Sequence, residues 1–208
     1  MTSAIFLFTL LFFCFSSQPV DAGELSGEML DRLQEIHAGI NSVSGFFIQE
    51  KQLSMLERGL VSRGEFAMAQ PGKVYWAYDY PMETGFSSDG ETLKRWSMES
   101  GKSQAVPLSR DPVLSVVVDQ MLAWSTMDTK ALKQDFSIYL IKPVPLTLKL
   151  VPSVKHLADI VHSVTIAFDD REKHIESIVI MENDGDKTVI SFKNVSLNQD
   201  LPAELFAP

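Results

Sequence analysis

The stretch Gly64–Pro81, G-E-F-A-M-A-Q-P-G-K-V-Y-W-A-Y-D-Y-P, decides how the rest of this chain is interpreted. It predicts a strand, a tight turn at Pro71-Gly72 and a second strand, because proline fixes φ and glycine supplies the permissive conformation that a turn needs. Side chains alternate along a strand, so each strand presents one apolar face. The residues on these faces are Phe66, Met68 and Gln70 in the first strand and Val74, Trp76 and Tyr78 in the second. This surface is either part of an ordinary half-buried hairpin or one wall of an apolar binding site.

The first 22 residues are predicted to form a cleavable signal peptide. Ile5–Phe15 is almost entirely apolar, but it is shorter than the roughly 20 apolar residues that span a membrane. The small residues Val20 and Ala22 suit cleavage after Ala22. We therefore expect a secreted chain whose single domain covers residues 23–208.

Cysteine content and charge restrict the class of protein. Cys14 is the only cysteine and follows two phenylalanines, which argues against a lipid-modified cysteine, so the mature chain should contain no disulfide. The chain has 18 basic and 27 acidic residues, and removal of Asp21 leaves 18 − 26 = −8. An acidic chain without a basic cluster disfavours nucleic acid and anionic lipid surfaces as partners. No later apolar run approaches the length of a membrane span.

The remaining pattern predicts a mainly β protein with a few helices. Residues 24–40 have an amphipathic helical period. Residues 45–108 read as a meander of strands, with a hairpin turn at Asp89-Gly90. A helix that is apolar on most of its circumference starts near Pro112, and strands resume from Phe136. About ten strands with short helices indicate one curved antiparallel sheet or barrel.

Signatures of catalysis and of metal binding are weak. None of the four histidines has zinc-ligand spacing, and no G-x-S-x-G or phosphate-binding glycine loop occurs. Asp169-Asp170 and Asp184 with Asp186 lie in predicted turns, where aspartate is common for backbone reasons, so calcium there is only a weak alternative. Asn194-Val195-Ser196 matches a glycosylation sequon. We expect no enzyme activity, no cofactor and no metal.

Several short motifs, taken in order, resemble the LolA-type periplasmic outer-membrane lipoprotein carriers. The motifs are Ser44–Gln49 (S-G-F-F-I-Q), Gly64-Glu65-Phe66, Pro71 with Trp76 five residues on, Tyr80-Pro81, Ser88–Leu93 (S-D-G-E-T-L), Leu150-Val151-Pro152, and Ile190-Ser191-Phe192 through Asn198 to Phe206. The resemblance covers nearly the whole mature chain. It implies an unclosed antiparallel β-barrel of about eleven strands with a helical lid.

The resemblance also implies a function. Such a protein shields the acyl chains of a lipoprotein or lipid between an inner-membrane exporter and an outer-membrane acceptor, and we expect a monomer. The residues that this reading assigns to the hydrophobic wall are Phe47, Phe66, Met68, Val74, Trp76, Tyr78 and Trp96. Those assigned to the lid are Leu33, Ile36, Val117, Met121 and Leu122.

One position departs from the family pattern. Better-known carriers have an arginine before the proline of the hairpin, which holds the lid, and this chain has Gln70 there. Glutamine offers two donors and no charge, whereas arginine offers five donors and a fixed charge. We expect a more weakly held lid and a specialised cargo.

Two other functions fit the pattern. The first is a periplasmic sensing or regulatory module that binds a membrane-protein partner, although such modules usually carry a second domain. The second is a hydrolase or isomerase acting on a lipid, which would need a polar dyad on the wall, where only Gln70 is evident.

Overall fold

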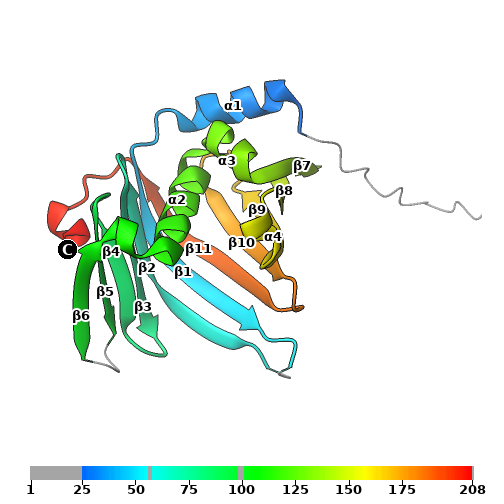
Figure 1. Ribbon diagram of the computed structural model, residues 1–208. Helices are drawn as coiled ribbons and strands as arrows, with labels where there is room; N and C mark the ends of the chain where they lie inside the picture. Colours follow the sequence, from blue (N-terminus) through cyan, green and yellow to red (C-terminus); the bar gives the residue numbers. More distant parts are fainter. Residues whose placement is uncertain (1–24, 56–57, 98–100, 208) are drawn as a thin grey trace, which may run out of the picture.

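The computed structural model describes residues 25–55, 58–97 and 101–207, and the predicted signal peptide lies outside them. The chain forms one antiparallel sheet of eleven strands in the order β6-β5-β4-β3-β2-β1-β11-β10-β9-β8-β7 (Figure 1). The strands are β1 (Ser42–Gln52), β2 (Leu60–Ala69), β3 (Lys73–Tyr80), β4 (Thr84–Ser88), β5 (Thr92–Ser97), β6 (Lys102–Pro107), β7 (Phe136–Pro143), β8 (Leu146–Pro152), β9 (Val161–Phe168), β10 (Ile175–Glu182) and β11 (Lys187–Leu197). The sheet does not close, because β6 and β7 stand at its two edges. The predicted architecture is confirmed.

Helices connect and cover the sheet. They are α1 (Gly27–His37), α2 (Pro112–Thr126), α3 (Thr129–Asp135) and α4 (Lys155–Ala158), with short 3-10 turns at Leu108–Arg110 and Ala203–Phe206. In Figure 1, α1 lies across one end of the curved sheet, and α2 crosses in front of it. In the described part of the chain, no helix is long and apolar enough to cross a membrane.

Side-chain caps fix where these helices begin. Ser26 accepts a hydrogen bond from the backbone N–H of Met29 at the start of α1. Asp111 accepts one from Leu114 at the start of α2, and Pro112 occupies the first turn, where its missing N–H has no partner to lose. Asp128 caps α3 in the same way. The predicted helix start near Pro112 is confirmed.

The core lies between the concave face of the sheet and the helices and occupies part of that space. Fully buried side chains come from both ends of the chain, among them Leu33 of α1, Phe47 of β1 and Leu148 and Ile166 of β8 and β9. Val118, Ala123 and Met127 of the α2 segment belong to the same cluster. Helix α2 is therefore a part of the core as well as a cover over it.

Gly64 sits where the β2–β3 pairing shifts register. Arg63 pairs with Tyr80 and Gly64 with Tyr78, so one residue of β3 is left over between them. A Cβ at Gly64 would overlap the carbonyl oxygen of Ala77. This observation confirms that Gly64 accommodates an irregularity in the strand.

The substitution Gly64→Ala should destabilise the fold by about 3 kcal/mol, because the strand backbone must move to relieve the overlap. Denaturant unfolding measures the change. Gly39→Ala is the matched control, since a Cβ there meets no atom within 4 Å. Equal stability of the two variants would show that the β2–β3 irregularity absorbs a side chain freely.

A buried histidine joins α1 to the turn between β9 and β10. His37 is 2% exposed, and its Nε2–H donates to the carbonyl oxygen of Glu172 at 2.9 Å. Arg32 pairs with the Glu172 carboxylate at 2.6 Å. Burial lowers the pKa of His37, although neighbouring carbonyl and carboxylate groups oppose the change. The ring is therefore neutral in the folded protein near pH 7.

Acid should loosen this contact. The unfolded chain protonates His37 below about pH 6.5, while the folded chain resists protonation, so the stabilising contribution is present above that pH and is lost as the pH falls below it. His37→Gln should flatten the loss of unfolding free energy between pH 7 and pH 5. Urea unfolding at several pH values measures this, and His156→Gln, at an exposed position, is the control. If the unfolding free energy of His37→Gln falls with pH as steeply as that of the wild type, His37 is not the source of the acid sensitivity.

Candidate functional site

An apolar cavity of about 370 Å³ lies between the concave face of the sheet and α2. Its volume falls at the lower end of the roughly 300–1,000 Å³ range of small-molecule sites. Lining residues of the sheet include Val43, Phe66, Met68, Trp76, Tyr78, Phe86, Val164, Ile178, Ile180, Ile190 and Phe192. Those of α2 are Val116, Val117, Gln120, Met121, Trp124 and Ser125.

Strand pairing builds the aromatic side of this cavity. Phe66 pairs with Trp76, and Trp76 pairs with Phe86 on the next strand. Directly paired residues point to the same face, so three rings lie in one row across β2, β3 and β4. The Phe66 ring also meets the Phe192 ring of β11 edge to face at 5.0 Å. The Gly64–Pro81 hairpin thus forms one wall of the cavity.

The residues assigned to the wall occupy three different places. Phe66, Met68, Trp76 and Tyr78 line the cavity. Phe47 and Val74 are 1% and 0% exposed, and Phe47 stacks on Trp76 with the ring centroids 4.0 Å apart, so these two support the wall from within the core.

Trp96 lies on the opposite face of the sheet. It pairs with Gly85, which pairs with Ala77, the neighbour of Trp76. Adjacent residues of a strand point to opposite faces, and the Trp96 ring accordingly stacks on Tyr75 at 5.9 Å. Trp96 is not among the residues that line the cavity.

The residues assigned to the lid are also divided. Val117 and Met121 of α2 line the cavity. Leu122 borders a smaller hollow beside it. Leu33 is fully buried in the core and Ile36 is half-buried, both on α1, and neither lies among the cavity-lining residues. The covering element of the cavity is α2.

Gln70 borders the smaller hollow together with Leu122, Ser125 and Thr126, at the carboxyl end of α2. Its backbone N–H donates to the carbonyl oxygen of Asn41 at 2.9 Å. Its side chain is exposed and makes no hydrogen bond within the described ranges. Gln70, the position expected to hold the lid, thus lies beside α2 but makes no side-chain hydrogen bond to it within the described residues.

A polar pair interrupts the apolar lining. The Tyr78 hydroxyl donates to Oε1 of Gln49 at 3.0 Å, and both residues line the cavity. Burial raises the pKa of Tyr78, although its hydrogen-bonding partners oppose the change. The phenol is therefore neutral near pH 7 and adds no charge to the lining.

Sequence reasoning missed the lining residues of the second half of the chain. β10 contributes Ile175, Ile178 and Ile180, and the turn before it contributes Lys173 and His174. This turn is organised by Asp169, whose Oδ1 accepts the backbone N–H groups of Lys173 and His174. The alternation of Val161–Phe168 and His174–Met181 could have identified their apolar faces. It could not have shown that these faces lie across the cavity from β2–β4, because that depends on the curvature of the sheet.

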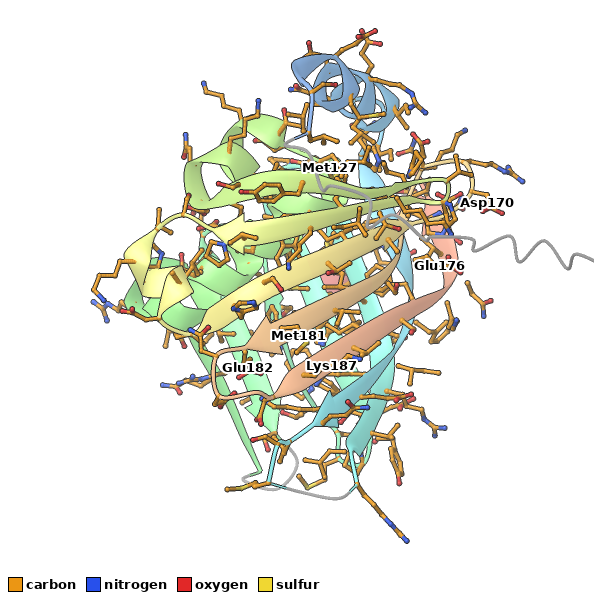
Figure 2. The ribbon with its side chains drawn as sticks, turned by 90° about the vertical axis from the view of Figure 1, so that its right-hand side faces the viewer. Met127, Asp170, Glu176, Met181, Glu182 and Lys187 are labelled. Carbon is orange, nitrogen blue, oxygen red and sulfur yellow. The ribbon has the colours of Figure 1, made fainter. Side chains whose placement is uncertain are left out.

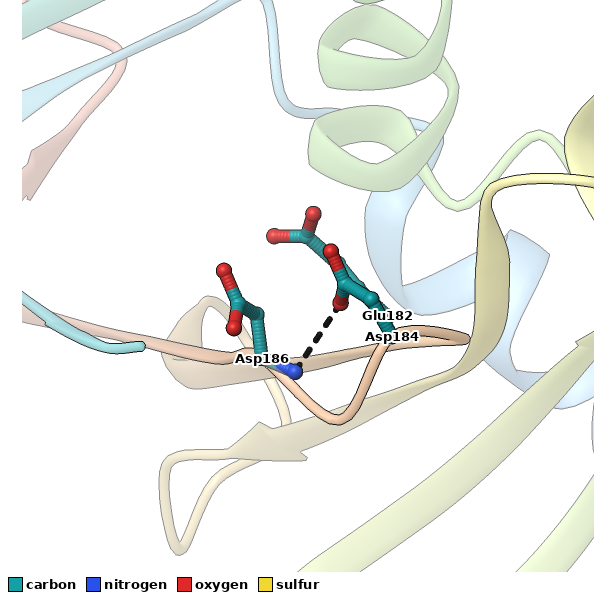
Figure 3. A group of neighbouring side chains, drawn as sticks. All are labelled: Glu182, Asp184 and Asp186. Carbon is teal, nitrogen blue, oxygen red and sulfur yellow. Dashed lines mark hydrogen bonds between the residues drawn. The ribbon is translucent and has the colours of Figure 1, made fainter. Parts of the chain in front are cut away.

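The carboxylates of the β10–β11 turn serve the fold. Figure 2 shows Met181, Glu182 and Lys187 at this end of the two strands, and Figure 3 shows the carboxylates of Glu182, Asp184 and Asp186 close together, with the Asp186 N–H donating to Asp184 at 3.0 Å. Lys51 of β1 pairs with Glu182 at 3.0 Å. The Glu182 hydrogen bond raises the pKa of Lys51, and burial opposes it. The group therefore connects the turn to β1.

The sequence of this chain matches a known protein family. A family model described as "Outer membrane lipoprotein carrier protein LolA" matches residues 38–208. An outer-membrane lipoprotein carrier protein of Pseudomonas entomophila is 26% identical over 187 residues, which cover 86% of this chain and 79% of the relative. One of Coxiella burnetii is 24% identical over 204 residues, covering 97% and 88%.

Solved structures were compared as well. The LolA superfamily protein from Nitrosomonas europaea aligns with a TM-score of 0.46 at 10% identity, over 87% of this chain and 96% of that one. The family assignment rests on the sequence match, which spans most of the chain and confirms the resemblance seen in the motifs. This protein belongs to the LolA family of outer-membrane lipoprotein carrier proteins.

Proposed function

We propose that this protein is a periplasmic carrier that holds an acyl chain of a lipoprotein or lipid beneath α2 and takes it from the inner to the outer membrane. The observation that carries the proposal is the apolar cavity of about 370 Å³ between the aromatic strands and α2. The family match supports the same role. Residues 1–22 would direct export and be removed after Ala22, which leaves the carrier domain of residues 23–208.

The energetics suit a carrier. Burial of a CH₂ group contributes about 0.8 kcal/mol, so a chain of about sixteen carbons gains roughly 10 kcal/mol at most. The cavity is small for such a site, and cargo with more than one chain therefore requires α2 to move outward. The cost of that movement lowers the net affinity, which helps release to an acceptor.

The proposed contacts come from a rigid wall and a movable cover. Phe66, Met68, Trp76 and Tyr78 form the wall, and Val117 and Met121 form the part of the cover that touches the chain. An inner-membrane exporter and an outer-membrane acceptor are the partners that this role requires. We propose that the protein acts as a monomer.

Binding is tested by displacement of a fluorescent fatty acid. Val117→Trp should weaken it about tenfold, because a larger side chain at the cavity mouth excludes about two CH₂ groups, or about 1.6 kcal/mol. Leu60→Trp is the matched control, since Leu60 is an aliphatic residue, 54% exposed, outside the cavity. No binding by the wild-type protein, together with no lipid in native mass spectra of protein from its own periplasm, would overturn the proposal.

The hold of α2 is tested at Gln70. Gln70→Arg places a cation near the carboxyl end of α2, where a positive charge is favourable, and adds donors for its last carbonyl groups. Release of a fluorescent acyl chain to acceptor vesicles should slow about fivefold, corresponding to about 1 kcal/mol. Gln70→Glu is the control with the opposite charge and should not slow release. If Gln70→Arg releases at the wild-type rate, this position does not act on the cover.

A further inference from the structure

Two polar atoms of α2 are buried beside the cavity without a partner. Among the described residues, Gln120 Oε1 and Trp124 Nε1 have no hydrogen bond and are shielded from solvent. Both residues line the cavity. They are four positions apart on one helix and therefore lie on the same side of it. Two unpaired polar atoms thus belong to chamber-lining residues of the cover, although the atoms themselves have no open surface in the empty chamber.

The orientation of the Gln120 amide is fixed by a neighbour. Its Nε2 donates to Oδ2 of Asp135 at 2.8 Å. A carboxylate accepts hydrogen bonds, so the NH₂ group must face Asp135, and the oxygen is left for another partner. The Trp124 indole N–H can only donate. The pair therefore offers one acceptor and one donor.

The polar pair on the opposite wall is different. Tyr78 and Gln49 bond to each other, so a ligand gains less by meeting them. An unpaired buried polar atom costs free energy, which a ligand recovers only if it supplies the missing partner. Gln120 and Trp124 are therefore the atoms that can discriminate between cargoes.

We infer that the cargo carries, next to its hydrocarbon chain, a group that both donates and accepts hydrogen bonds, such as a secondary amide or a hydroxyl. Its N–H or O–H donates to Gln120 Oε1, and its oxygen accepts from Trp124 Nε1–H. Because both atoms are shielded in the empty chamber, the side chains shift as the cargo enters. The inference rests on the proposed function, since it names the kind of lipid that the cavity prefers.

The test compares ligands that share one chain and differ only in the polar group. N-methylhexadecanamide donates and accepts, while N,N-dimethylhexadecanamide and methyl hexadecanoate only accept. The first should displace a fluorescent fatty acid about tenfold more effectively than the other two. Hexadecan-1-ol against its methyl ether makes the same comparison for a hydroxyl, and the more effective of the two donors identifies the source of the group.

Two variants assign the preference to its atoms. Gln120→Met removes the acceptor, and Trp124→Phe removes the donor while keeping an aromatic ring. The readout is the ratio of the two amide affinities, which should fall toward one in Gln120→Met. In Trp124→Phe, every ligand of the series loses the donor to its oxygen, so all affinities should fall together while the preference for the secondary amide remains. Circular dichroism establishes that each variant is folded. If a variant does not fold, the ligand series on the wild-type protein still tests the inference.

The outcomes separate the inference from the function. Tighter binding of a donating ligand that is lost in Gln120→Met, together with a uniform loss of affinity in Trp124→Phe, supports the inference. Equal affinities across the wild-type series overturn it and leave the carrier function standing. A preference that persists in folded Gln120→Met overturns the assignment to Gln120, and unchanged affinities in folded Trp124→Phe overturn the assignment to Trp124. If the fluorescent fatty acid binds but none of the lipids displaces it, the inference alone fails. If the probe itself does not bind and native mass spectra show no lipid, the proposed function fails together with the inference.

Discussion

The pairing of β1 with β11 is the constraint on which the rest of the structure depends. It runs from Val43 opposite Leu197 to Gln52 opposite Lys187 and joins two meanders that are distant in sequence. Without it, β1–β6 and β7–β11 would each expose an apolar face. With it, the faces belong to one curved sheet, and Phe66 of β2 can meet Phe192 of β11. The cavity exists because these two halves face each other across a space that side chains do not fill.

Helix α2 controls how much of that space remains. Its Val118 and Ala123 are buried in the core, while Val116 and Val117 are more than a third exposed at the cavity. A helix that is apolar on most sides is usually enclosed by protein. Here one side packs against the core and another borders the chamber, so part of the apolar surface of α2 stays exposed at the cavity. The unpaired atoms of Gln120 and Trp124 indicate incomplete packing on the same side.

Residue patterns predicted the sheet better than they predicted its inner surface. Alternation placed Phe66, Met68, Trp76 and Tyr78 on one wall, because each strand keeps a strict period of two. The sequence pattern predicted about ten strands and the resemblance about eleven, and the described part of the chain contains eleven. Alternation within one strand does not show which of its faces is inward. Trp96 was misplaced for this reason, although the buried Leu93 three positions earlier has the opposite parity and indicated the inner face of β5.

Irregular pairing also limits what alternation can predict. In β11, Ile190 and Phe192 line the cavity, and so do Val195 and Leu197, which have the other parity. The change occurs where the β1–β11 register shifts by one residue and Asn194 adopts a positive φ of 51°. A bulge of this kind redirects the side chains that follow it. The local sequence does not predict this bulge, since asparagine is also common in turns.

The division of labour between the wall and the cover explains how one cavity can both bind and release. Phe47 stacks beneath Trp76, and Phe47 and Val74 are almost completely buried, so the wall cannot move without opening the core. The cover has weaker ties, because Gln70 does not hold the carboxyl end of α2 and only the Gln120–Asp135 and Thr129–Gln34 hydrogen bonds join the side chains of α2, α3 and α1 in the described residues. Under the proposed function, cargo with more than one chain displaces α2 as it enters. The same displacement, driven by an acceptor, would let the chain leave without disturbing the strands.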